Sequence, residues 1–303
     1  MQPDKAIKNS TPLDVCECNN FHAELDKFLF KCLYVHRTEW DFIGSFGKKE
    51  YMSDVDVAIK EEELNLEAAK EILSALGHEV KIYKGFNELS FGFPFKQQIV
   101  QVDLMFSKNL EWTKFIYYSP DLLGGESKYK GIYRNLLLSA ILITDSRFEL
   151  DDGSIFQMIL RLNEGVFNVH KERIGNVSKI TQEQFITDDP KRFIELLGLY
   201  GKCLTLEEVL QQVVFRKNSN EILERFYKFC QWSKLNTNFM GETKKMVDTE
   251  YEQMNLWIES ILEEAARFNL REEVYESAQQ NIQDDPSIQI IEAYQIAFEE
   301  WVK

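Results

Sequence analysis

Two aspartates separated by a single residue, Asp54 and Asp56, have the types and spacing in this chain that most suggest chemistry. Side chains alternate along a β-strand, so the sequence predicts both carboxylates on one face of a strand, with Val55 and Val57 on the other. Two like charges at this spacing repel each other unless a divalent cation lies between them. The spacing therefore predicts a metal-binding pair.

A glycine–serine turn, Gly44-Ser45, precedes the aspartate pair, and the loop between them carries Lys48. Such a turn leaves backbone N–H groups and a hydroxyl available for phosphate oxygens, and a glycine lets the backbone approach closely. Further along, Asp103 alternates with apolar residues in the run QIVQVDLMF, which predicts a third carboxylate on a strand. Three acids and a glycine–serine turn suit metal-assisted chemistry on a phosphate.

The segment from Ser127 to Ile143 is predicted to be a helix capped by Ser127. Lys130 and Arg134 are four residues apart and are therefore neighbours on one helix face. This face is either solvated or a phosphate-binding surface, and both interpretations stay open. The residues expected to pack inward are Ile132, Leu136 and Ile141.

The elements that position these residues follow from hydrophobic periodicity and from turn residues. Helices are predicted after Asn20, ending near His36, and from Glu61 to Leu76. Strands are predicted at 41–43, 54–59, 78–83, 89–95 and 99–106, a small hairpin near 148–173, and mostly helices from Thr181 onward. The fold class is an α/β (α+β) domain with a mixed sheet, followed by a mainly helical domain. The expected division is a flexible lead-in at 1–18, a catalytic domain at 19–145 and a C-terminal domain at 146–303.

Composition limits the class of protein. The chain has 303 residues, of which 44% are hydrophobic and 28% charged, as in folded globular proteins. The sequence has neither a run of about 18 apolar residues nor a signal peptide. We therefore expect a cytoplasmic protein without a membrane partner. Five scattered cysteines suit a reducing compartment better than a disulfide framework.

The formal net charge of −15 disfavours broad phosphate neutralisation of a long nucleic acid. Residues 241–303 contribute much of this excess, with 15 acidic and 5 basic residues. Acidic helices of this kind are expected either to be solvated or to bind a protein partner.

Taken together, these motifs resemble the DNA polymerase β-like nucleotidyltransferase superfamily. Its signature is a Gly-Ser, an Asp-x-Asp and a third Asp in a later strand, matched here by Gly44-Ser45, Asp54-Val55-Asp56 and Asp103. The resemblance covers about residues 20–145. The sequence around Asp103, QVDLMFSKNLEW, is also similar to members encoded by tailed bacteriophages.

The resemblance implies a nucleotidyltransferase that moves an NMP from an NTP to an acceptor hydroxyl and releases pyrophosphate. It implies that Asp54 and Asp56 hold two Mg²⁺ ions, with Mn²⁺ as a substitute, and that Asp103 completes one site and helps activate the acceptor. It further implies that Ser45 contacts a terminal phosphate, and that cations after the third acid bind phosphate. An RNA 3′ end, a protein and a small molecule all stay open as acceptors.

Two alternatives also stay open. One is a catalytically silent nucleotide-binding or regulatory protein that keeps the fold, acting through its acidic helices. The other is a metal-dependent glycosyltransferase of the Asp-x-Asp type, which needs neither the Gly44-Ser45 turn nor Asp103.

Overall fold

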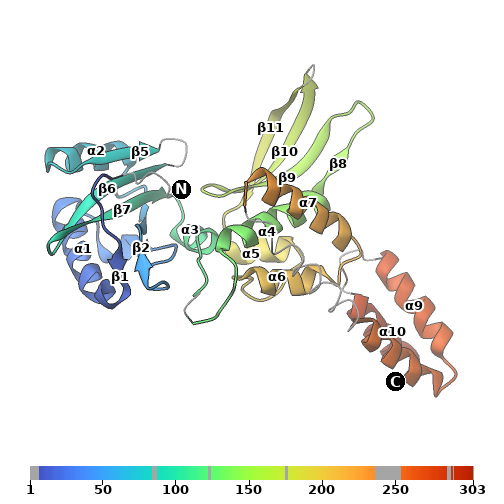
Figure 1. Cartoon of the computed structure of the whole chain (residues 1–303). Helices are drawn as coiled ribbons and strands as arrows, with labels where there is room; N and C mark the ends of the chain where they lie inside the picture. The colour runs from blue at the N-terminus through green and yellow to red at the C-terminus, as the bar shows by residue number, and fades with distance from the viewer. Residues whose placement is uncertain are drawn as a thin grey trace. The chain divides into compact units, whose positions relative to one another are not determined.

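The computed structural model describes residues 7–83, 87–121, 124–174, 177–235, 254–284, 288 and 290–302 (Figure 1). The chain forms two compact units. The first comprises Met1–Ile132 and Leu150–Phe193, and the second comprises Tyr133–Glu149 and Ile194–Lys303. The sequence predicted a single boundary near residue 145. The structure differs, because residues 133–145 belong to the second unit and residues 150–193 belong to the first.

A five-stranded mixed sheet forms the centre of the first unit, in the order β2-β4-β7-β6-β5. Its strands are β2 (Trp40–Phe42), β4 (Val55–Lys60), β5 (Val80–Tyr83), β6 (Glu88–Phe95) and β7 (Gln98–Ser107). Strands β4 and β7 run parallel, and the other neighbouring pairs are antiparallel. The predicted mixed sheet is therefore confirmed.

Two helices bury their apolar stripes in the core of this sheet, namely α1 (Cys18–Cys32) and α2 (Leu66–Ala75). The core includes Phe21 of α1, Leu73 of α2 and Val57 of β4, all fully buried. Helix α1 ends four residues before the predicted His36. Helix α2 begins five residues after the predicted start at Glu61, and Leu76 follows it and is 51% exposed.

The N-terminal lead-in is part of this core where the structure describes it. Strand β1 (Leu13–Asp14) pairs with β3 (Tyr51–Met52), and a 3-10 turn (Val15–Glu17) leads into α1. Ile7 is 1% exposed and donates its backbone N–H to Gln101 Oε1. The predicted flexible lead-in is therefore wrong for residues 7–18, because their apolar side chains are buried, whereas residues 1–6 lie outside the described part.

After the sheet come a short helix and an antiparallel meander. The helix is α3 (Leu110–Ile116), and the meander consists of β9 (Ile155–Arg161), β10 (Gly165–Ile174) and β11 (Val177–Thr187). The predicted hairpin near 148–173 is confirmed as β9 and β10. The helical prediction from Thr181 onward is wrong as far as Thr187, because β11 pairs along β10.

The second unit is mainly helical, as predicted. Its elements are α4 (Gly131–Ser146), the short strand β8 (Phe148–Glu149), α6 (Leu206–Val213), α7 (Ser219–Trp232), a helix at 254–266, α9 (Arg271–Asp284) and α10 (Ile290–Val302); α5 (Pro190–Leu196) joins the two units in sequence. Helix α4 begins at Gly131, so the predicted cap by Ser127 is wrong. The hydroxyl of Ser127 instead accepts from the Tyr129 N–H within the preceding loop.

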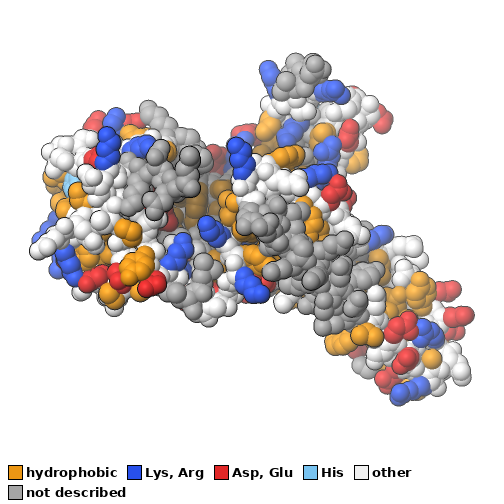
Figure 2. All heavy atoms as spheres, viewed as in Figure 1, with side chains coloured by type: hydrophobic (Ala, Val, Ile, Leu, Met, Phe, Trp, Pro, Cys, Tyr) orange, Lys and Arg blue, Asp and Glu red, His pale blue; other side chains and the backbone are white. Residues whose placement is uncertain are grey.

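The terminal helices have a separate small core containing Val274, Ala278 and Ala297. Several large apolar side chains on them are exposed, including Trp257 at 57% and Trp301 at 50%. Figure 2 shows apolar side chains at the surface of this part among acidic ones. Among the described residues, no helix combines the length and the apolar character needed to cross a membrane.

Candidate active site

The predicted acids come from adjacent parallel strands. Asp56 of β4 lies directly opposite Asp103 of β7 in the register of the sheet. Asp54 lies in the bend just before β4, so its predicted place within the strand is wrong by one residue. The topology therefore places Asp103, which is distant in the sequence, beside the segment that carries Asp54 and Asp56.

Burial and neighbouring carboxylates change the pKa of Asp56. Burial raises the pKa of Asp56 to about 8, and the carboxylates of Asp54, Asp103 and Glu88 add to this shift. Lys49 opposes the shift. A buried carboxylate surrounded by like charges holds its proton until a cation balances it.

Asp103 and Glu88 show the same effect. Burial, and then the charge of Asp54, raise the pKa of Asp103, while the side chains of Ser90 and Gln101 oppose the shift. Gln101 Nε2 donates to the two carboxylate oxygens at 3.0 and 3.2 Å. Burial, Asp103 and Asp54 raise the pKa of Glu88 to about 7.

The glycine–serine turn packs against Asp56. Gly44 has a φ of +64°, and a Cβ at this position would lie 2.2 Å from Asp56 Oδ2. Its N–H donates to the carbonyl of Tyr117 at 3.0 Å, and the buried Ser45 follows it. Glycine is therefore needed here both for its backbone conformation and for the close approach of the carboxylate.

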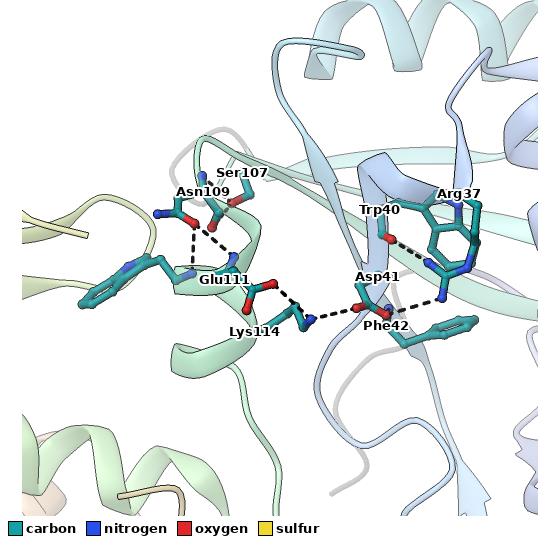
Figure 3. Close-up of polar contacts among 9 residues, drawn as sticks. Arg37, Trp40, Asp41, Phe42, Ser107, Asn109, Glu111 and Lys114 are labelled. Atoms are coloured by element: carbon teal, nitrogen blue, oxygen red, sulfur yellow. Dashed lines mark hydrogen bonds and ion pairs between the residues drawn. The ribbon is translucent and has the colours of Figure 1, made fainter. Parts of the chain in front are cut away.

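Polar contacts join helix α3 to β2 and cap the start of the helix (Figure 3). Lys114 of α3 binds Asp41 of β2 at 3.0 Å and Glu111 at 3.2 Å. Asn109 caps the helix by accepting from the backbone N–H groups of Glu111 and Trp112. The end of α3 at Tyr117 is thereby set against Gly44.

Tyr117 connects the acid site to the meander. Its hydroxyl donates to Asn163 Oδ1 in the β9–β10 turn, and Trp112 Nε1 donates to the carbonyl of Leu162 in the same turn. Burial, with the charges of Glu88 and Asp56, raises the pKa of Tyr117 to about 12. The turn of the meander thus lies next to the carboxylates.

The predicted cations have three different surroundings. Lys48 donates to the carbonyl of Ser119 at 2.6 Å and lies over the ring of Tyr118, and burial lowers its pKa. Lys130 is exposed and lies just before α4, so its predicted place on that helix beside Arg134 is wrong by one residue, and it belongs to the same unit as the acids. The structure therefore leaves Lys48 and Lys130 as candidates for phosphate contact.

Arg134 is a correction. It is fully buried in the second unit, where its guanidinium donates to Asn135 Oδ1 and to the carbonyl of Leu204. Arg134 was predicted to lie on a solvent or cleft face of the helix. This prediction is wrong, because the exposed face of α4 does not include Arg134. Ile132, which was expected to pack inward, is 43% exposed.

The candidate ligands can be compared with what Mg²⁺ requires. All candidate ligands are carboxylate oxygens, which hard divalent cations prefer. Within the described ranges, no three His, Cys, Asp or Glu side chains form a metal-binding group as they stand. Mg²⁺ commonly takes one or two carboxylates and completes its shell with substrate phosphates and water, so Asp56 with Asp54 or Asp103 fits this ion.

Comparison with known proteins adds little to this geometry. No family model and no curated protein matches the chain. The ternary gap complex of Leishmania infantum polymerase beta aligns over 64% of this chain and 70% of that chain, with 13% identity and a TM-score of 0.38. A ternary P/T complex of the same polymerase aligns over 65% and 77%, with 14% identity and a TM-score of 0.37. Both TM-scores are low, so these structures say nothing about the role of the site residues.

The sequence did not single out Glu88, Ser90 or Tyr117 as site residues. Ser90 lies in the strand predicted at 89–95, whereas Glu88 lies one residue before it and joins the same face because β6 begins at Glu88. Tyr117 lies at the end of α3, a helix that was not predicted. Its place near Asp56 depends on the bridge between Gly44 and Tyr118, a long-range contact that no local pattern indicates.

Proposed function

We propose that this chain is a Mg²⁺-dependent nucleotidyltransferase that moves an NMP from an NTP to an acceptor hydroxyl. The observation that carries the proposal is the pairing of Asp56 with Asp103 across adjacent parallel strands, with Asp54 nearby and the Gly44 turn against the Asp56 carboxylate. This arrangement offers carboxylates for cations beside the glycine–serine turn, whose Ser45 hydroxyl is a proposed phosphate contact.

In the proposed reaction, the acceptor oxygen forms a bond to the α-phosphorus, and the bond between this phosphorus and the bridging oxygen to the β-phosphate breaks. Pyrophosphate leaves with the electrons of that bond, and Asp103 accepts the proton of the acceptor hydroxyl. Asp54 and Asp56 would hold Mg²⁺, which supplies charge neutralisation for the triphosphate. Ser45, Lys48 and Lys130 are the proposed phosphate contacts.

The glycosyltransferase alternative explains less of the site, because its chemistry uses neither the Gly44 turn nor Asp103. A silent nucleotide-binding protein would keep the same geometry, and turnover separates it from an enzyme. The cytoplasm is the proposed compartment, supported by five cysteines that are all free thiols. A protein partner for the acidic terminal helices is also part of the proposal.

The experiment is to incubate the chain with labelled NTPs, Mg²⁺ and candidate acceptors, and to compare it with an Asp54→Asn/Asp56→Asn variant. Asparagine has nearly the size and shape of aspartate and carries no charge, so this variant should fold. We expect its transfer rate to fall by about a thousandfold or more, which is the scale of losing charge stabilisation in a transition state. The exposed Asp151→Asn/Asp152→Asn pair is the matched control and should keep full activity. Full activity in the Asp54/Asp56 variant would overturn the proposal.

A further inference from the structure

Strand β6 adds polar groups to the acid site that the glycine–serine and aspartate motifs do not include. Ser90 lies directly opposite Asp103 in the register of β6 and β7. Glu88 is two residues away and therefore lies on the same face of the sheet. The charge of Asp103 raises the pKa of Glu88, and the charge of Glu88 raises that of Asp56, so the groups are close in space as well as in register.

Ser90 is a buried hydroxyl without a partner. It is 1% exposed, and within the described part of the chain its Oγ makes no hydrogen bond. It lies close enough to Asp103 to lower the pKa of that carboxylate, although the two side chains are not in hydrogen-bonding geometry. A buried polar atom left unpaired is unfavourable, so a ligand that satisfies it is favoured.

Glu88 lacks a compensating cation. Among the residues that the structure describes, it forms no ion pair, and the charged groups that raise its pKa are Asp103 and Asp54. The proposed chemistry already uses Asp54, Asp56 and Asp103 for cations and for the acceptor proton. Glu88 is therefore a surplus negative charge on the Asp103 side, where the acceptor is expected.

We infer that Glu88 and Ser90 form the acceptor subsite and bind a primary ammonium group that the acceptor carries near its reactive hydroxyl. An ammonium has three N–H donors, which match the Glu88 carboxylate and the acceptor lone pairs of the Ser90 hydroxyl. A charge-assisted hydrogen bond of this kind is stronger than a neutral one. The substrate class is a small amino alcohol, such as an amino sugar. The inference rests on the proposed function, since it names the acceptor of that same site.

The test uses D-glucosamine and N-acetyl-D-glucosamine, which share their hydroxyls and differ in the charge of the amine. Binding of each to the full chain is followed by NMR chemical-shift titration in the presence of Mg²⁺ and a non-hydrolysable NTP analogue. We expect glucosamine to bind at least tenfold more tightly than its acetylated form. In Glu88→Gln this preference should vanish, and in Ser90→Ala it should fall severalfold.

Glu79→Gln is the matched control, because it removes an exposed carboxylate just before β5 and should keep the preference. Equal binding of the two sugars by the unmodified chain, or a preference that survives in Glu88→Gln, would overturn the inference. Calorimetry of the Mg²⁺–NTP analogue in the same samples separates the two proposals. Retained nucleotide binding without an amine preference contradicts the subsite alone, whereas loss of nucleotide binding contradicts the proposed function.

Discussion

At the scale of single residues, Asp56 gives the site a pH dependence. Its pKa is about 8 in the folded chain, and 3.8 is the ordinary value for an unfolded aspartate. The folded state therefore binds the proton more tightly, and its free energy of unfolding falls as the pH rises from about 4 to about 8. Glu88, with a pKa of about 7, acts in the same direction.

We predict that Asp56→Asn removes much of this decline in metal-free protein. At pH 5 the variant and the parent should have similar stability, and at pH 8 the variant should be the more stable. Denaturant unfolding at both pH values measures the difference. The same loss of stability between pH 5 and pH 8 in both proteins would contradict the electrostatic account of the site.

Gly44 and Gly47 form a second residue-scale test. Both have a positive φ, +64° and +71°, but a Cβ at Gly47 would meet no atom within 4 Å, whereas a Cβ at Gly44 would collide with Asp56. Alanine at either position should cost about 1–2 kcal/mol of backbone strain. Only Gly44→Ala should also displace the carboxylate and weaken Mg²⁺–NTP binding by tenfold or more, as measured by calorimetry. Equal nucleotide binding by the two variants would show that the close approach of Gly44 is unimportant.

At the scale of elements, helix α3 links the site to the meander. Asn109 caps α3 and also donates through Nδ2 to the carbonyl of Asp188, next to β11. Asn65 caps α2 by accepting from the Ala68 N–H. The two caps are chemically alike, but only the first supports Tyr117 and the Gly44 turn.

We therefore predict that Asn109→Ala and Asn65→Ala each lower the free energy of unfolding by about 1 kcal/mol. Nucleotidyl transfer should fall severalfold in Asn109→Ala and stay unchanged in Asn65→Ala. Transfer rates measured beside thermal unfolding separate the effects. Equal activity of the two variants would show that the cap of α3 does not support the site.

Local sequence patterns predicted the elements with strong periodicity. Strands β4, β6 and β7 and helices α1 and α2 were found because apolar spacing alone defines them. Strand β11 was missed because its polar residues, including Gln182 and Gln184, are exposed and leave no apolar alternation. Arg134 was misplaced because a fully buried arginine on a helix has the same local sequence as a solvated one. The three aspartates were predicted from their motif, but Glu88 and Tyr117 depend on strand order and long-range contacts.

At the scale of the whole molecule, the terminal helices have a core of their own, separate from that of the sheet. Ala278 is fully buried there, and Gln280 of the same helix is exposed. Ala278→Leu should overpack this core and cost about 1–3 kcal/mol. Gln280→Leu adds the same side chain at the surface and should cost little.

Hydrogen exchange measures where this change acts. In Ala278→Leu we expect faster exchange in α9, α10 and residues 254–266, with unchanged protection in β4 and β7. Faster exchange throughout the mixed sheet would instead show that the two cores unfold as one cooperative unit.

The fate of a radioactive label tests the central claim most directly. Water is a slow substitute for the acceptor hydroxyl, so the chain can be incubated with Mg²⁺ and with α-labelled or γ-labelled NTP before any acceptor is known. Nucleotidyl transfer predicts labelled NMP from the first nucleotide and labelled pyrophosphate from the second, both abolished in Asp54→Asn/Asp56→Asn. Labelled NDP and inorganic phosphate, or products that persist in the variant, would contradict the assignment of this site.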